Sequence, residues 1–154
     1  MNGVALLECE IPPELVERFR LRKRLYSRGP GIQEFRFLWL DAVRLLPIWY
    51  EGEFQIVPWG NIDRRCALPQ TGWTWKQSLD EGRWGNCQPE GVRILANLAL
   101  ANGVWYPVRQ GIQGILVRDQ NQIPHVYVVC KEPSRYYRVM TRTDRQPILI
   151  EEDI

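Results

Sequence analysis

The segment RRCALPQTGWTWK, residues 64–76, brings two arginines, a thiol and two tryptophans into thirteen positions. A guanidinium can bind a phosphate through two parallel N–H donors, and an indole can stack on an unpaired base. The same residues would also suit a core strand, a turn and a hydrophobic cover, because cysteine and tryptophan are often buried. We expect Cys66 and Leu68 in the core, and Arg64, Arg65 and Trp73 beside a cleft.

A second set of arginines near the end of the chain could converge on the same face and contact phosphates. The set consists of Arg135, Arg138, Arg142 and Arg145. The alternative is a solvated surface whose cations pair with some of the 18 acidic residues. The net charge of +2 is too small to indicate a nucleic-acid partner, so the argument depends on where the charges lie.

The four cysteines are Cys9, Cys66, Cys87 and Cys130, and His125 is the one histidine. No pair of cysteines has the C-x-x-C spacing that is typical of structural zinc sites. We therefore expect free thiols, no metal site and no cofactor. An enzyme of unfamiliar type, with Cys9 or Cys66 as its nucleophile, stays open as an alternative.

The length of 154 residues, with 45% hydrophobic and 25% charged residues, favours one globular domain, residues 1–154. No apolar run approaches the roughly 20 residues that span a bilayer, and no signal peptide is recognisable. We expect a cytoplasmic protein with no membrane partner.

Two parts are expected within this domain: a basic N-terminal helix or arm, residues 1–31, and a β-rich core, residues 32–154. Pro12–Glu14 can begin a helix, which breakers at 27–31 would end. Alternating apolar residues and turn residues predict strands at 35–40, 43–50, 54–59, 65–68, 104–108, 112–117, 124–130 and 147–150. Short helices are expected at 76–81 and at 134–140, the latter capped by Ser134. The predicted class is α+β, with a mostly antiparallel, barrel-like sheet.

Four segments, in order, resemble the SOS-response-associated peptidase family, whose members sense abasic sites and crosslink to single-stranded DNA. Residues 45–60 look like its strand pair that ends in Trp-Gly. Residues 64–75 resemble its Arg-Arg-Cys-x-x-Pro-x-x-Gly-aromatic-x-x-Trp segment, and residues 123–132 resemble its late core strand. Residues 143–150 are similar to its His-Asp-Arg-Met-Pro-Val-Ile-Leu ending. The resemblance implies a DNA-handling fold in a shortened, divergent member.

The chain departs from this family at the positions that carry its chemistry. The family's N-terminal cysteine corresponds to Asn2, and its histidine corresponds to Thr143. The segment with the family's asparagine is missing after Gly60, and its glutamate has no counterpart between Gly72 and Trp75. Without a nucleophile and positioned proton carriers, we expect no crosslinking activity.

Together these observations predict a non-catalytic protein that binds single-stranded nucleic acid through a basic and aromatic cleft. The predicted contact residues are Trp59, Gly60, Arg64, Arg65, Trp73, Arg142 and Arg145, of which the resemblance most directly supports Trp59 and Arg145. The tryptophans at 75, 84 and 105 could also stack on bases, or they could serve only as core and cover. An alternative is a phage or mobile-element accessory protein that acts through a protein partner.

Overall fold

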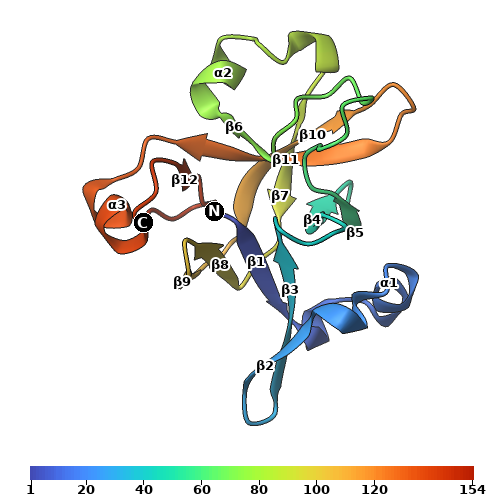
Figure 1. Ribbon diagram of the computed structural model, residues 1–154, viewed down its shortest axis with the longest axis vertical. Coiled ribbons are helices and arrows are strands. Elements are labelled where there is room, and N and C mark those ends of the chain that lie inside the picture. The colour runs from blue at the N-terminus through green and yellow to red at the C-terminus, as the bar shows by residue number, and fades with distance from the viewer.

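The computed structural model describes all 154 residues and shows two curved, mostly antiparallel sheets with short helices at their margins (Figure 1). The first sheet has the order β2 (Leu25–Gly29), β3 (Ile32–Leu38), β1 (Gly3–Leu7), β8 (Leu98–Ala101) and β9 (Val104–Pro107). The second has the order β12 (Gln146–Pro147), β11 (Pro124–Lys131), β10 (Ile112–Arg118), β7 (Glu90–Ile94), β4 (Leu45–Tyr50) and β5 (Glu53–Pro58). A short strand, β6 (Trp73–Trp75), pairs in parallel with β11. The predicted α+β class with a barrel-like antiparallel sheet is confirmed.

The helices are short and lie outside the sheets. They are η1 (Glu8–Glu10), α1 (Pro13–Arg18), η2 (Leu21–Arg24), α2 (Lys76–Asp80), η3 (Gly85–Cys87) and α3 (Arg135–Thr141). The Ser134 side chain accepts a hydrogen bond from the Tyr137 N–H at 3.1 Å, so it caps α3 as the sequence predicted. None of these helices combines the length and the apolar composition that a membrane span requires.

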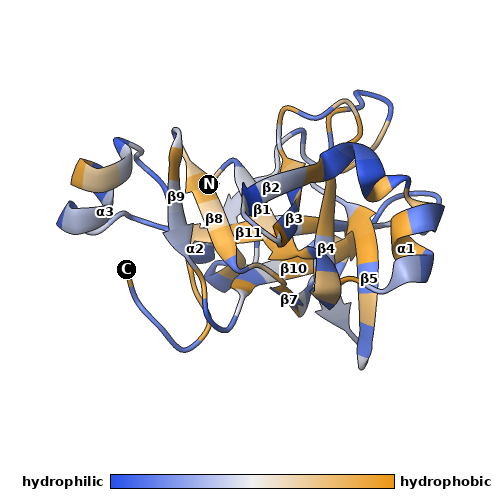
Figure 2. Ribbon diagram, turned by 90° about the horizontal axis from the view of Figure 1, so that it is seen from below, coloured by the Kyte–Doolittle hydropathy of each residue, from blue (hydrophilic) through white to orange (hydrophobic).

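The hydrophobic core lies between the two sheets. It is formed by side chains such as Val4, Phe37, Leu46 and Ile94, each of which is fully buried. A smaller apolar cluster around Val117 and Tyr127 covers the other face of the β10–β11 hairpin. Figure 2 shows apolar residues along β4, β5 and β10, with hydrophilic residues concentrated in the surrounding loops. Because β10 and β11 are covered on both faces, they are nearly continuous hydrophobic runs.

The predicted N-terminal helix is wrong beyond Arg18. Arg20 adopts the left-handed conformation (φ 54°), which ends the α-helical path, and residues 25–29 form a strand against β3. Residues 1–31 are also not a separate arm, because β1 lies between β3 and β8 in the middle of the first sheet. Cys9, expected in a strand, is exposed in η1.

Three other expectations need correction. Residues 65–68 form turns rather than a strand. The expected final strand, residues 147–150, is reduced to β12 and one isolated bridge between Leu149 and Ile112. The apolar run at 92–100, whose type the sequence left open, is divided between β7 and β8.

The first two residues are part of the fold rather than an extension from it. The Asn2 N–H donates to the Leu100 carbonyl at 2.7 Å, and the Asn2 carbonyl accepts from the Trp39 N–H at 3.0 Å. The Met1 side chain is buried in the main core. The start of the chain therefore lies against β8 and near β12 (Figure 1).

Gly60 fixes the start of the long loop between β5 and β6. Its φ of +58° is in the left-handed region, and an added Cβ would collide with the Thr71 carbonyl oxygen. The Gly60 N–H also donates to the Val126 carbonyl at 2.7 Å. Only glycine therefore allows the two ends of this loop to come together.

We predict that Gly60→Ala lowers the free energy of unfolding by about 2–4 kcal/mol, because backbone strain and the collision add together. Gly91→Ala is the matched control, since a Cβ added there would have no atom within 4 Å and its φ is ordinary; it should change stability by less than about 1 kcal/mol. Urea denaturation measures both values. Equal stabilities of the two variants would contradict the proposed role of Gly60.

Candidate nucleic-acid-binding groove

A row of three tryptophans leads from the core to the surface. Trp59 follows β5, Trp39 follows β3, and Trp73 begins β6. The ring centroids of Trp59 and Trp39 lie 5.2 Å apart, and those of Trp39 and Trp73 lie 5.3 Å apart. The guanidinium of Arg145 lies 3.6 Å from the centroid of the Trp73 ring. This is a cation–π contact, so the aromatic row holds a positive charge at its outer end.

Gly72 makes the close packing of this row possible. The Trp59 indole N–H donates to the Gly72 carbonyl at 2.9 Å, and the Val128 N–H donates to the same oxygen at 3.0 Å. A Cβ at Gly72 would lie 2.7 Å from the Trp39 ring and 2.8 Å from the Trp59 indole nitrogen. Any larger residue would push the rings apart.

Arg145 borders an open cavity of about 490 Å³ near the start of the chain. We call this cavity the Arg145 pocket; its lining residues are Met1, Asn2, Trp73, Trp75, Asn102, Arg142, Thr143, Asp144 and Arg145. They come from the start of the chain, from β6, from the turn after β8 and from the segment between α3 and β12. Four segments that are distant in the sequence therefore build one site.

Two further hollows share lining residues with the Arg145 pocket, and we call the three together the Trp75 groove. Trp75 lines all three cavities and is 38% exposed. One hollow extends along Ser78 and Arg83, and the other reaches Lys131 on β11. The groove is thus longer than a site for one small anion.

The positive charges in the groove differ in whether they already have a partner. Lys76, Arg83 and Lys131 each form an ion pair with a nearby carboxylate. Arg142 and Arg145 form no ion pair. These two guanidinium groups are therefore available for an anionic ligand such as a phosphate.

Two buried polar atoms in the Arg145 pocket have no hydrogen-bond partner: the Asn2 side-chain oxygen and the Nε of Arg145. A buried polar atom without a hydrogen-bond partner destabilises the folded state. Burial lowers the pKa of Arg145, but a guanidinium remains charged at neutral pH. Burial also lowers the pKa of the Met1 amino group to about 6, so this group adds little charge at neutral pH. The Arg145 guanidinium is thus the charged group that lines the pocket, and the two unpaired atoms lie buried beside it.

Three of the seven predicted contact residues lie in this pocket: Trp73, Arg142 and Arg145. Trp59 is only 1% exposed, so its ring has no free face for a base and supports the groove from below. Gly60 is likewise buried, and it shapes the chain rather than contacting a ligand.

Arg64 and Arg65 lie in the exposed loop between β5 and β6 and do not line the groove. Arg65 pairs with Asp63 at 3.2 Å, with both side chains largely exposed. The expectation that these two arginines stand beside the same cleft as Arg145 is therefore wrong. Two arginines that are adjacent in the sequence do not indicate on which surface of the fold their loop lies.

The sequence prediction named neither Asn2 nor Asn102 as a member of the pocket, and it left Trp75 undecided. Asn2 was noted only for the absence of a cysteine, and Asn102 was not noted at all. Asn102 follows β8, and its side-chain amide donates to the Thr141 carbonyl at 3.1 Å. A signal for Asn2 existed, because the resemblance placed a functional position there; none existed for Asn102.

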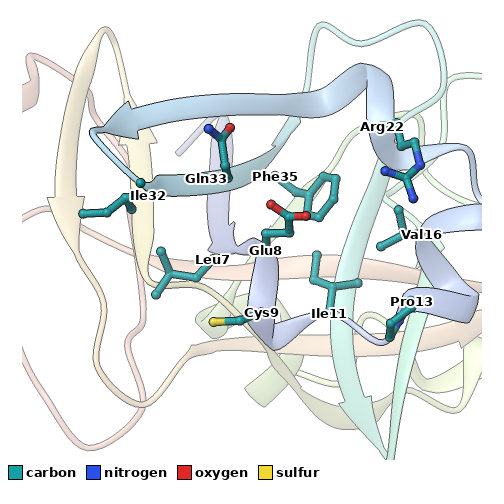
Figure 3. Close-up of a pocket in the computed structure, with 11 residues that line it drawn as sticks. Leu7, Glu8, Cys9, Ile11, Pro13, Val16, Arg22, Ile32, Gln33 and Phe35 are labelled. Carbon is teal, nitrogen blue, oxygen red and sulfur yellow. The ribbon is translucent and has the colours of Figure 1, made fainter.

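The largest cavity of the molecule, about 590 Å³, lies elsewhere, beside η1 and the β2–β3 hairpin (Figure 3). Cys9 is on its border, at the end near Leu7 and Ile32, and Arg22 lies at the opposite end. The one histidine of the chain is not among the lining residues. Glu8, a carboxylate next to Cys9 in the sequence, lines the same cavity, and the enzyme with Cys9 as its nucleophile stays an untested alternative.

Comparison of the chain with protein-family models, curated proteins and solved structures found no match. The argument for function therefore depends on the groove itself. Two of the four segments that resemble the abasic-site sensors, represented by Trp73 and Trp75 and by Thr143–Arg145, line the same pocket, and so does Asn2, at which the chain departs from that family.

We predict that Trp59→Ala and Trp75→Ala have very different effects on stability. Trp59 is buried and hydrogen-bonded, so its removal should cost about 3–5 kcal/mol. Trp75 is partly exposed, so its removal should cost about 1 kcal/mol or less. Urea denaturation of the two variants separates the supporting tryptophan from the ligand-facing one. Similar losses for both would contradict the assignment.

Proposed function

We propose that this chain binds single-stranded nucleic acid in the Trp75 groove without reacting with it, as a shortened relative of the SOS-response-associated peptidase family. The observation that carries the proposal is that two guanidinium groups without carboxylate partners, those of Arg142 and Arg145, lie beside the exposed ring of Trp75. Phosphates would bind the guanidinium groups, and a base would stack on the indole.

The arrangement favours single strands over duplexes. Stacking on Trp75 requires a base whose face is free, and the bases of a duplex are covered by their neighbours. The face of Trp73 is already covered by Arg145, so Trp75 provides the main stacking surface. Three connected hollows give room for more than one nucleotide.

Asn2 and Thr143 line the Arg145 pocket at the positions where the resemblance places the family's cysteine and histidine, so the thiol and the imidazole of the family's reaction are missing there. The Thr143 hydroxyl lies 2.9 Å from the Thr141 hydroxyl, with which it shares a hydrogen bond, and 3.3 Å from the Arg145 carbonyl, to which it can donate. The Thr143 hydroxyl is therefore already hydrogen-bonded within the protein. Cys130 is 1% exposed, and burial raises the pKa of its thiol to about 11. This thiol stays protonated at neutral pH and is inaccessible. Binding without crosslinking is the function that these groups support.

We predict that a fluorescently labelled single-stranded oligonucleotide binds the wild-type protein at low salt with a Kd below about 100 μM, the weak end of non-specific binding. Arg145→Gln should weaken binding about tenfold or more, because it removes a phosphate contact. Trp75→Ala should weaken it about 5- to 150-fold, because one stacked base is worth about 1–3 kcal/mol. Fluorescence anisotropy measures all three.

Arg64→Gln is the matched control, because it removes one exposed arginine that lies outside the groove; its Kd should stay within about twofold. With two phosphate contacts, the plot of log K against log salt should have a slope near about −1.4. The proposal fails if the wild type binds the oligonucleotide with a Kd weaker than about 100 μM, or if Arg64→Gln weakens binding as much as Arg145→Gln.

A further inference from the structure

Cys66, Asp119 and His125 come together at the β5–β6 loop, and none of them lines the Trp75 groove. Each offers one ligand atom, and these three atoms all lie within 4.8 Å of one another. Cys66 comes from the loop, Asp119 follows β10, and His125 is at the start of β11. Asp119 and His125 are each only 9% exposed. No sequence spacing predicted this cluster, because its members lie on three separate segments.

The hydrogen bonds of His125 direct one of its ring nitrogens at the Asp119 carboxylate. Its Nδ1 lies 2.7 Å from the Gly60 carbonyl oxygen, which can only accept, so Nδ1 carries a hydrogen. In the neutral ring, Nε2 then has a lone pair, yet it lies 3.0 Å from an oxygen of the Asp119 carboxylate. Two lone pairs at this distance repel each other unless a proton or a metal ion lies between them.

The groups around the cluster match those that orient metal ligands. A histidine that binds a metal usually donates its other N–H to a carbonyl or carboxylate, as His125 does to Gly60. The second oxygen of Asp119 accepts the N–H groups of Asn121 at 2.8 Å and Ile123 at 3.0 Å. The turn therefore fixes the carboxylate and leaves its other oxygen directed at His125.

Cys66 is held beside this pair by contacts on both sides. The Gln120 side chain donates to the Arg65 carbonyl at 3.0 Å and accepts from the Ala67 N–H at 3.2 Å. In tetrahedral zinc geometry, the ligand atoms lie about 3.3–3.6 Å apart. The longest separation, which is at most 4.8 Å, must therefore shorten by up to about 1 Å, which a rotation of the partly exposed Cys66 side chain can supply.

We propose that Cys66, Asp119 and His125 bind one zinc ion, with water as the fourth ligand. Thiolate and imidazole favour zinc over magnesium or calcium, which prefer oxygen ligands. The ion would tie the β5–β6 loop to the β10–β11 hairpin. A Cys–His–Asp catalytic triad fits less well: Nε2 of His125 faces the Asp119 carboxylate and Nδ1 faces the Gly60 carbonyl, so neither ring nitrogen is left for the thiol, and none of the larger cavities reaches these residues.

The test is a zinc titration of the full chain after treatment with a chelator. Isothermal calorimetry should show one zinc ion per chain, and Tm should rise by about 5–10 °C at a free zinc concentration about a hundredfold above Kd. Cobalt added in place of zinc should give a thiolate charge-transfer band. No heat, no Tm shift and no band in the wild type would overturn the proposal.

Two variants identify the site. Cys66→Ser should remove the cobalt band and the zinc-dependent rise in Tm. Cys87→Ser is the control, because Cys87 is, like Cys66, partly buried against the apolar cluster around Val117 and Tyr127 but is not one of the three proposed ligands. This variant should keep both the cobalt band and the zinc-dependent rise in Tm. His125→Asn gives a second test of the ligand set, with circular dichroism to verify folding. Zinc binding that survives Cys66→Ser, or that Cys87→Ser removes, would overturn the assignment.

Discussion

The stack that runs from Trp59 through Trp39 and Trp73 to Arg145 is the interaction on which the groove depends. Its inner end is in the main core, and its outer end is a guanidinium without a carboxylate partner. A cation over an indole is worth about 0.5–2 kcal/mol, more when it is desolvated. Trp39 follows a strand of the first sheet, and Trp59 and Trp73 lie at strand ends of the second, so the row links the two sheets. The stack therefore fixes the sheet junction and the charged site together.

The loop between β5 and β6 connects the groove to the Cys66–Asp119–His125 cluster. Gly60 begins the loop and accepts the hydrogen bond from His125, whereas Gly72 ends it and accepts the Trp59 indole N–H. An ion bound at the cluster would stabilise the segment that presents Trp73 and Trp75.

Local pattern predicted much of the fold. The β10–β11 hairpin, the Ser134 cap of α3 and the turn at Glu51–Gly52, where both residues have positive φ, follow from alternation and turn chemistry. The N-terminal helix was overextended because apolar spacing alone cannot show that Arg20 is left-handed.

The candidate site was harder to predict than the fold. The arginines at 142 and 145 do line the Arg145 pocket, but Arg64 and Arg65 lie outside the groove. Which face a loop covers depends on tertiary contacts, such as those of Gln120 with the backbone of Arg65 and Ala67.

The indole N–H signals of the seven tryptophans, followed by NMR as single-stranded DNA is added, test the central claim most directly. The groove account predicts that the signals of Trp73 and Trp75 shift in proportion to bound DNA, while those of Trp49 and Trp105, which lie outside the groove, stay in place. Shifts that are confined to tryptophans outside the groove, or the absence of any shift at saturating DNA, would contradict it.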